Sequence, residues 1–107
     1  YRQTLMEINM IIVNASLKAK EDKIDEIISE AEKLIVASRE HEGNITYNLY
    51  KDVLDNSLTF VEKWESKKAL EKHMKTDEFI AFGNDIKEFL TDELDVTVYV
   101  AEAVTGN

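Results

Sequence analysis

The sequence FVEKWESKKALEKH at residues 60–73 changes from a strand pattern to a helix pattern with almost no loop between them. Alternate residues of the first part fall on one side of a strand, and they are Leu58, Phe60, Glu62 and Trp64. Ser66 follows, and its hydroxyl is suited to accept a hydrogen bond from the free N–H groups of a first helical turn. Glu62 is the exception in this pattern, because a purely structural strand would have an apolar residue there.

The helix that begins after Ser66 is predicted to carry three residues on one face. Leu70, His73 and Met74 are spaced i, i+3 and i+4, and this spacing aligns side chains on a helix. The only Trp and one of the two His residues therefore lie on adjacent elements. A new N-cap at Thr76 predicts a second helical piece at residues 77–90. Its predicted buried face consists of Phe79, Ile80, Phe82, Ile86, Phe89 and Leu90.

The rest of the chain completes a ferredoxin-like order. The other predicted elements are a strand at 10–17, a helix at 21–42, a strand at 44–51, a turn at 52–57 and a strand at 95–104. Gly43 is expected to end the long helix as its C′ residue. The order β-α-β-β-α-β predicts an α+β fold with a four-stranded antiparallel sheet and both helices on one face.

A single domain at residues 10–104 accounts for all of these elements. Residues 1–9 are interpreted as an N-terminal extension, either a native arm or non-native sequence, and residues 105–107 as a tail. The chain of 107 residues is long enough for one modest core.

Composition excludes several classes of partner. The net charge is −9, which argues against nucleic acid or an anionic membrane surface, since both require a basic patch. No apolar run approaches the roughly 20 residues of a membrane span. With no Cys there is no disulfide framework, no zinc–thiolate site and no cysteine nucleophile. A cytoplasmic location is the expectation.

Both sides of the predicted strands carry apolar residues, whereas two helices cover only one face of a sheet. Val61, for example, lies opposite Phe60 and Trp64, and Val98 lies opposite Tyr99. An uncovered apolar face favours association. The sequence therefore predicts a homodimer in which two sheets meet face to face.

These elements together resemble the antibiotic biosynthesis monooxygenase (ABM) domain in its small stand-alone, quinol-monooxygenase-like form. The resemblance covers nearly all of residues 10–104. It is carried by MIIVNASLKAK at 10–20, EGNITY at 42–47, FVEKWE at 60–65, the A-L-x-x-H spacing at 69–73 and DEF at 77–79.

The resemblance implies a dimeric α+β barrel with a pocket between the sheet and the helices of each subunit. It also implies a monooxygenase with no flavin, no metal and no other cofactor, in which an electron-rich quinol or polyphenol activates dioxygen itself. The protein would deprotonate, orient and desolvate this small aromatic substrate.

Asn14 and Trp64 match the strand-borne Asn and Trp that the resemblance implicates in oxygenation. An amide and an indole N–H can both hydrogen-bond the oxygen atoms of a substrate or peroxy intermediate. Each residue also has a structural interpretation, Trp64 as core and Asn14 as an end-of-strand residue bonded to backbone.

His73 is the third predicted catalytic residue. It is a candidate general base for a quinol proton, or alternatively a helical His bonded to a carboxylate such as Glu62. Glu62 is expected to orient His73, to bind a substrate hydroxyl, or to pair with a Lys. No partner is identified for His41. The remaining predicted substrate-binding residues are Tyr47, Met74, Phe79 and Phe82.

A related haem-degrading branch also resembles the chain at Asn14 and Trp64. It carries an axial His on the last helix, and that position falls here at Gly83. Haem is therefore not expected as a partner. Two further functions stay open: isomerisation or breakdown of a small oxygenated metabolite, and non-catalytic binding of a small molecule in a stress-linked protein.

Overall fold

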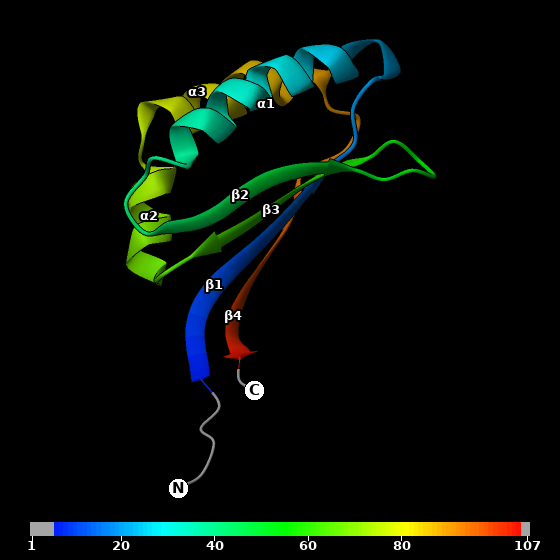
Figure 1. The fold of residues 1–107 in the computed structure, drawn as a ribbon. Helices are drawn as coiled ribbons and strands as arrows, with labels where there is room; N and C mark the ends of the chain where they lie inside the picture. The colour runs from blue at the N-terminus through cyan, green and yellow to red at the C-terminus, as the bar shows by residue number, and fades with distance from the viewer. Residues whose placement is uncertain (1–5, 106–107) are drawn as a thin grey trace, which may run out of the picture.

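The computed structural model describes residues 6–105. Within this range, a four-stranded antiparallel sheet packs against three helices on one face (Figure 1). The strands are β1 Met6–Leu17, β2 Asn44–Lys51, β3 Leu58–Trp64 and β4 Asp95–Thr105. The helices are α1 Ile24–Ser38, α2 Lys67–Met74 and α3 Asp77–Ile86, with 3-10 turns at Glu21–Lys23 and Lys87–Phe89. The predicted α+β, ferredoxin-like fold is confirmed.

β1 is longer than the sequence pattern predicts. Residues 6–9 pair antiparallel with residues 102–105 at the end of β4. The predicted strand bounds of 10–17 and 95–104 are therefore too short, by four residues at the start of β1 and by one at the end of β4. The reason is that each segment provides the other with inter-strand hydrogen bonds. The division into an extension, a domain and a tail stays a prediction. Residues 1–5, 106 and 107 lie outside the described residues.

α1 ends earlier than predicted. Its buried stripe of Ile27, Ala31, Leu34 and Ser38 follows the expected helical spacing, but Ser38 is its last residue. The Arg39 side chain then donates to the Tyr47 carbonyl at 3.1 Å and to Asn48 Oδ1 at 2.9 Å, which fixes the end of α1 against β2. The predicted end at residue 42, and with it the C′ role of Gly43, is wrong because the chain turns toward β2 directly after Ser38.

Ser66 and Thr76 cap two successive helices, as predicted. Ser66 Oγ accepts a hydrogen bond from a first-turn N–H of α2 at 3.1 Å, and Thr76 Oγ1 accepts one from α3 at 3.3 Å. The Thr76 hydroxyl also donates to the His73 carbonyl at 2.7 Å, so the same side chain closes α2 and opens α3. Ile80 was predicted to be buried on α3 but is 49% exposed, because the change of direction at Thr76 turns it outward.

β3 is the strand that organises the sheet. The strand order β2-β3-β1-β4 places β3 between β2 and β1. Its register pairs Glu62 with Val13 of β1 and with Tyr47 of β2. Alternate β3 residues from Leu58 to Trp64 are buried on the helical side, as the sequence pattern predicts.

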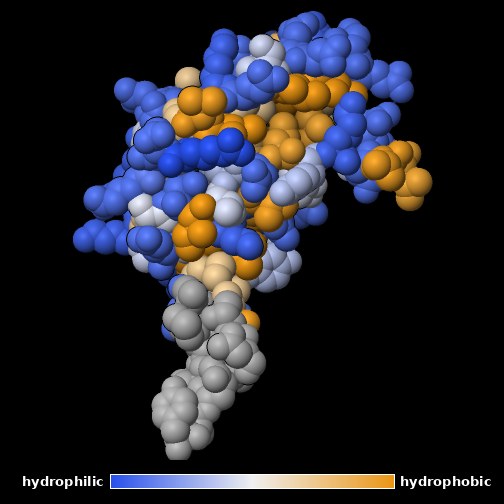
Figure 2. Space-filling view, in the orientation of Figure 1, coloured by the Kyte–Doolittle hydropathy of each residue, from blue (hydrophilic) through white to orange (hydrophobic). Residues whose placement is uncertain are grey.

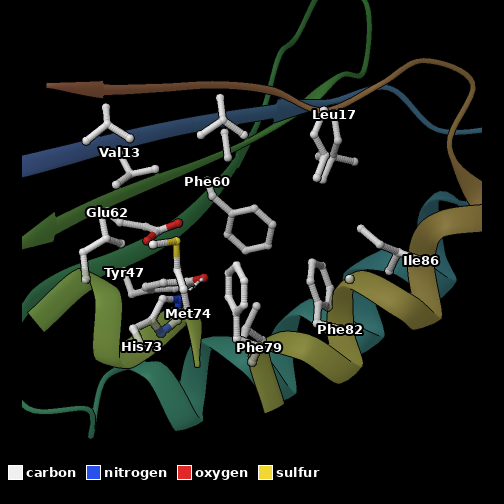
Figure 3. Close-up of a pocket in the computed structure, with 17 residues that line it drawn as sticks. Val13, Leu17, Tyr47, Phe60, Glu62, His73, Met74, Phe79, Phe82 and Ile86 are labelled. Carbon is white, nitrogen blue, oxygen red and sulfur yellow. Dashed lines mark hydrogen bonds between the residues drawn. The ribbon is translucent and has the colours of Figure 1, made fainter. Parts of the chain in front are cut away.

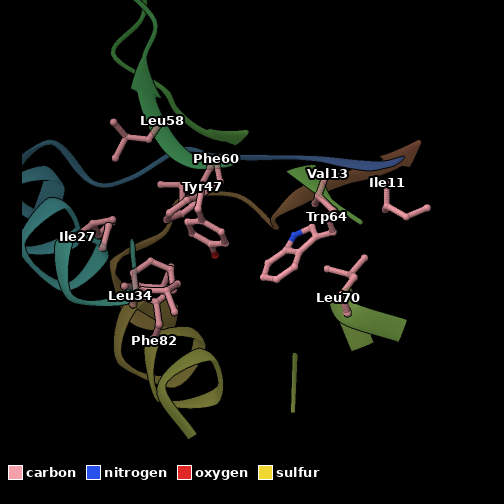
Figure 4. Packing of buried hydrophobic residues seen from close by; sticks show 14 residues of the cluster. Ile11, Val13, Ile27, Leu34, Tyr47, Leu58, Phe60, Trp64, Leu70 and Phe82 are labelled. Carbon is pink, nitrogen blue, oxygen red and sulfur yellow. The ribbon is translucent and has the colours of Figure 1, made fainter. Parts of the chain in front are cut away.

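The core lies between this face of the sheet and the helices. Figure 4 shows Phe60, Tyr47 and Trp64 pointing from the strands toward side chains such as Phe82 of α3. The rings of Phe60 and Phe82 meet edge to face with centroids 5.6 Å apart, a favourable aromatic geometry. Four aromatic side chains, Tyr47, Phe60, Trp64 and Phe82, therefore belong to a buried cluster that is otherwise aliphatic.

The surface in Figure 2 is mainly hydrophilic over the outer side of the helices, while hydrophobic residues gather between the helical layer and the sheet. A second hydrophobic spot is the β2–β3 turn, where Val53 and Leu54 are almost fully exposed. Across residues 6–105, none of the helices combines the length and apolar character needed to cross a bilayer.

Gly43 joins the end of α1 to β2 in a conformation that other residues rarely adopt. Its φ is +81°, and a Cβ at this position would lie 2.5 Å from the Cβ of Ala69 on α2. Its carbonyl accepts a hydrogen bond from Glu65 N at 2.8 Å, at the end of β3. The glycine therefore permits the close approach that brings α2 under β2 and β3.

We expect Gly43→Ala to lower the free energy of unfolding by about 2–3 kcal/mol, because it combines a strained φ with a clash against Ala69. Gly83→Ala is the matched control, since Gly83 lies within α3 and an added Cβ there meets nothing within 4 Å. The control should gain about 0.5–1 kcal/mol from helix propensity. Urea unfolding of both variants measures the difference, and equal stabilities would contradict this role of Gly43.

Candidate active site

A cavity of about 160 Å³ lies between the helical face of the sheet and helices α1, α2 and α3. Its walls are mostly aliphatic and aromatic, and three polar side chains reach them: Tyr47, Glu62 and His73. Figure 3 shows these three at one end of the cavity, while Leu17 and Ile86 form the opposite, aliphatic end. The cavity therefore has one chemically reactive end and one end suited only to apolar groups.

All five predicted substrate-binding residues line this cavity. Met74 comes from α2, and Phe79 and Phe82 come from α3. Figure 3 shows the Glu62 carboxyl group directed into the cavity beside Met74. Phe79 also packs edge to face on His73, with ring centroids 4.9 Å apart. The structure thus brings together five predicted substrate-binding residues and one predicted catalytic residue, His73.

Glu62 is a carboxyl group in an apolar environment. Its residue is only 5% exposed, and its Oε1 accepts a hydrogen bond from the Trp64 indole N–H at 2.9 Å. Burial raises the pKa of Glu62 to about 7, and the donors on Trp64 and Tyr47 oppose that rise. Glu62 therefore changes protonation state near neutral pH, which is the property of a general base or acid.

Trp64 lies behind the cavity wall and does not line it. It is completely buried, and its ring lies 4.6 Å from the His73 ring. Its N–H, which the sequence suggested would donate to substrate, is bonded to Glu62 instead. The geometry supports a positioning role for Trp64, and direct contact with substrate stays a prediction.

Asn14 is on the opposite side of the sheet from the cavity. Its strand neighbours Val13 and Ala15 line the cavity, and alternate side chains of a strand point to opposite faces. Its Oδ1 is buried and has no hydrogen-bond partner among the described residues. The structure therefore does not bring Asn14 together with Glu62 and His73, and its catalytic role stays a prediction.

His73 is buried and belongs to a chain of hydrogen bonds. Its Nε2 lies 3.4 Å from the Tyr47 hydroxyl, and its Nδ1 lies 2.9 Å from Nδ1 of His41. His41 Nε2 in turn lies 2.9 Å from Glu78 Oε1. The alternative interpretation that His73 is a partly exposed residue bonded to Glu62 is wrong, because the α2 helix directs its ring toward Tyr47 and His41.

The protonation of His73 follows from its surroundings. Burial lowers the pKa of His73 to about 4, the nearby His41 lowers it further, and Glu78 partly opposes this. His73 is therefore neutral at physiological pH. Burial also raises the pKa of the Tyr47 hydroxyl well above its ordinary range, and the adjacent Glu62 adds to this.

The sequence did not identify His41 and Glu78 as part of this site. They lie far from His73 along the chain, with separations of 32 residues from His41 to His73 and 37 from His41 to Glu78. Glu78 belongs to the DEF segment that carries the family resemblance, but this segment does not indicate a contact with His41. The two residues meet only because α2 and α3 pack beside the α1–β2 turn. One amino-acid sequence alone contains no local pattern that predicts this contact.

The space around Gly83 and the arrangement of possible metal ligands describe what the site can hold. Gly83 lies on the cavity wall, and a Cβ there would meet nothing within 4 Å. Within residues 6–105, no three His, Asp or Glu side chains converge as a metal site requires.

Comparison with known proteins identifies related sequences and structures. Residues 10–84 match the family model described as "ABM: Antibiotic biosynthesis monooxygenase". The chain is 39% identical over 88 residues to the Bacillus subtilis protein named "Putative monooxygenase YcnE", which covers 81% of this chain and 93% of that protein.

Solved structures agree with this likeness. A conserved protein from Methanosarcina mazei Go1 superposes with a TM-score of 0.83 at 27% identity, covering 86% of this chain and 92% of that one. A structure described as antibiotic biosynthesis monooxygenase superposes with a TM-score of 0.77 at 26% identity, covering 89% and 99%.

We expect Glu62→Gln to change how stability depends on pH. Glu62 binds its proton more tightly in the folded state, where its pKa is about 7, than at its ordinary value of 4.5. Its contribution to stability is therefore fully present below about pH 4.5, is lost as pH rises toward 7, and stays lost above that. Glutamine does not titrate, so the free energy of unfolding of the variant should gain about 3 kcal/mol relative to wild type between the two ends of this window.

Denaturant unfolding at several pH values measures this difference. Glu65→Gln is the matched control, because Glu65 is close in sequence but exposed. Parallel pH profiles for wild type and Glu62→Gln would contradict the raised pKa.

Proposed function

The chain belongs to the antibiotic biosynthesis monooxygenase family, and from this premise we propose that it is a cofactor-independent monooxygenase that oxidises a small quinol or polyphenol with dioxygen. The observation that carries the proposal is Glu62, a carboxyl group with a pKa of about 7 inside an apolar cavity. Such a group can remove a hydroxyl proton from an aromatic substrate in a site shielded from water.

The size and lining of the cavity favour one aromatic ring. Its volume of about 160 Å³ is close to that of engineered apolar cavities that hold benzene. Phe60, Phe79 and Phe82 offer ring faces and edges for aromatic packing. A ring placed between them would direct a hydroxyl group toward Glu62 at the polar end.

Glu62 would act as the general base. The Trp64 N–H holds its Oε1 in place, which leaves the carboxylate oriented toward the cavity. Removing a proton from a quinol raises the electron density of the ring, and an electron-rich ring reduces dioxygen directly. Trp64 is therefore a positioning residue in this proposal, and it also limits the rise in the pKa of Glu62.

The reaction balances without a further reductant. A hydroquinone and one dioxygen molecule give a hydroxyquinone and one water molecule. One oxygen atom bonds to a ring carbon, the other leaves as water, and the ring supplies all of the electrons. The substrate proton taken by Glu62 is returned when the O–O bond breaks, so no net proton is consumed.

Oxygen consumption across a panel of quinols and polyphenols tests the proposal. We expect turnover with monocyclic substrates, incorporation of label from heavy-isotope dioxygen into the product, and a rate that rises with pH through about 7. Glu62→Gln should lower kcat by about 100-fold or more, whereas Glu65→Gln should not change it.

Trp64→Phe separates positioning from direct contact with substrate. It removes the N–H donor that favours the ionised form of Glu62, so the midpoint of the kcat–pH profile should move above that of wild type. Substrate conversion without oxygen consumption would favour isomerisation or breakdown of a metabolite. Ligand binding without conversion would favour a binding protein, and either result would overturn the monooxygenase proposal.

We further propose that the protein is a homodimer that covers the side of the sheet away from the helices, including Ile12, Val61 and Tyr99. Val61 faces away from the helices, since its neighbours Phe60 and Glu62 line the cavity on the helical side. β4 also has half-exposed residues on its helical side, among them the cavity-lining Val96 and Val98. A second copy packed on the face that carries Ile12, Val61 and Tyr99 would remove the apolar surface of that face from water.

We expect Val61→Asp to convert the dimer to monomer or to unfold the protein at micromolar concentration, because it places a charge in the centre of the proposed interface. Ser29→Asp is the control, since Ser29 is exposed on α1, which packs on the other face of the sheet. Light scattering measures the mass, and a stable monomer of 12.3 kDa for the wild type would contradict the dimer.

A further inference from the structure

A continuous chain of hydrogen-bonding groups leads from the cavity to the protein surface. It begins at Tyr47 on β2, continues through His73 on α2 and His41 in the turn after α1, and ends at Glu78 on α3. Exposure increases along it: His73 is 1% exposed, the His41 side chain 16% and the Glu78 side chain 44%. The inner end lines the cavity and the outer end reaches solvent.

The three contacts fix a direction when both rings are neutral. The Glu78 carboxylate accepts, so His41 Nε2 carries a hydrogen and His41 Nδ1 does not. His41 Nδ1 must then accept from the Nδ1–H of His73, which leaves His73 Nε2 as an acceptor for the Tyr47 hydroxyl. Every donor in this arrangement points outward, from the cavity toward the surface.

We propose that Tyr47, His73 and His41 form a proton relay between Glu62 in the cavity and Glu78 at the surface. The proposal rests on the proposed function, in which Glu62 takes a proton from the substrate. Tyr47 and Glu62 are paired across β2 and β3, and the Tyr47 hydroxyl hydrogen-bonds the Glu62 carboxyl group and also lies 3.4 Å from His73 Nε2. Because this hydroxyl has one hydrogen, it donates to Glu62 when the carboxyl group is ionised and to His73 when the carboxyl group is protonated. When Glu62 holds the proton, Tyr47 receives it and passes its own hydrogen to His73 Nε2.

The relay gives Glu62 a route for exchanging its proton with solvent. Glu62 is only 5% exposed in a cavity whose walls are largely carbon, and Tyr47 and His73 are the other polar side chains that line this cavity. Each proton that is transferred through the relay moves the hydrogen of each ring to its other nitrogen. After a proton has moved outward, the two rings therefore hold the tautomers that are needed to transfer a proton inward. The relay therefore lets Glu62 exchange its proton with solvent in either direction, so that its protonation state can be reset between the two proton steps of the proposed reaction.

His73 is suited to pass a proton rather than to store it. Burial lowers its pKa to about 4, so a doubly protonated His73 is not populated at neutral pH. The groups facing it from the surrounding elements are Tyr47, Glu62, His41 and Glu78. A concerted transfer, in which one nitrogen gains a proton as the other loses one, avoids the charged ring.

The rings are held in place by their surroundings. His73 packs against Trp64 and Phe79, with ring centroids 4.6 and 4.9 Å away. The backbone of His41 is fixed because its N–H donates to the Ser38 carbonyl and its carbonyl accepts from Asn44 N. Proton transfer through stationary rings therefore needs less motion than rotation of a ring.

Nitrogen-15 NMR of the two histidine side chains tests the relay without any substrate. With both rings neutral, we expect His73 to carry its hydrogen on Nδ1 and His41 on Nε2. We also expect a scalar coupling between the two Nδ1 atoms through the hydrogen bond. No such coupling, or a His73 ring protonated at Nε2, would overturn the relay. Spectra of His41→Ala assign the two rings.

Kinetics test whether the relay works during turnover. His41→Ala should lower kcat by about 10- to 100-fold with little change in KM and should increase the solvent isotope effect, because proton transfer becomes rate-limiting. Added imidazole should restore much of the loss by occupying the vacated space. The matched control is Glu42→Ala, since Glu42 is adjacent but pairs only with the exposed Lys72 among the described residues.

The two arms separate failure of the relay from failure of the proposed function. If no quinol is turned over by wild type, the monooxygenase proposal fails while the NMR result still decides whether the hydrogen-bonded chain exists as assigned. Normal kcat in His41→Ala, in an active enzyme, would overturn the relay alone.

Discussion

The hydrogen bond from the Trp64 indole N–H to the Glu62 carboxyl group is the interaction on which the rest of the site depends. Both residues lie two positions apart on the helical side of β3. Apolar side chains are usual on this buried side, because a buried carboxyl group costs free energy unless it is hydrogen-bonded. Burial alone would push the pKa of Glu62 higher, and a carboxyl group that never ionises cannot remove a proton. The indole donor keeps the pKa near 7, so that both forms are available at physiological pH.

The local structure after β3 positions the remaining groups. Ser66 starts α2 directly after the strand, and this short connection places His73 beneath the Trp64 ring. Thr76 then ends α2 and starts α3, which directs Phe79 and Phe82 toward the cavity. The close approach of α2 to the start of β2 requires Gly43. Two caps and one glycine therefore determine the shape of the reactive end.

An apolar cavity with one titratable carboxyl group imposes a physical constraint on any chemistry inside it. Charge created by deprotonation is costly in such a site, so a proton that Glu62 takes from a substrate must return in a later step. The hydrogen-bonded chain from Tyr47 to Glu78 provides the connection to solvent that the apolar walls do not. The cavity itself favours an uncharged aromatic ring, since it offers ring packing on most sides and polar contacts only near Glu62.

The sequence by itself determined the order of the elements, the alternation of β3, the two helix caps and most of the cavity-lining residues, because these depend on spacing along a few consecutive residues. It also singled out Glu62 as an anomaly, although not its bond to Trp64. It misplaced the end of α1 and the start of β1, where the outcome depends on partners such as Arg39 with β2 and residues 102–105 with residues 6–9. Only the tertiary structure decided that Asn14 faces away from the cavity and that His41, His73 and Glu78 meet. Those contacts join residues more than 30 positions apart through the packing of separate helices, and no local pattern encodes such a distance.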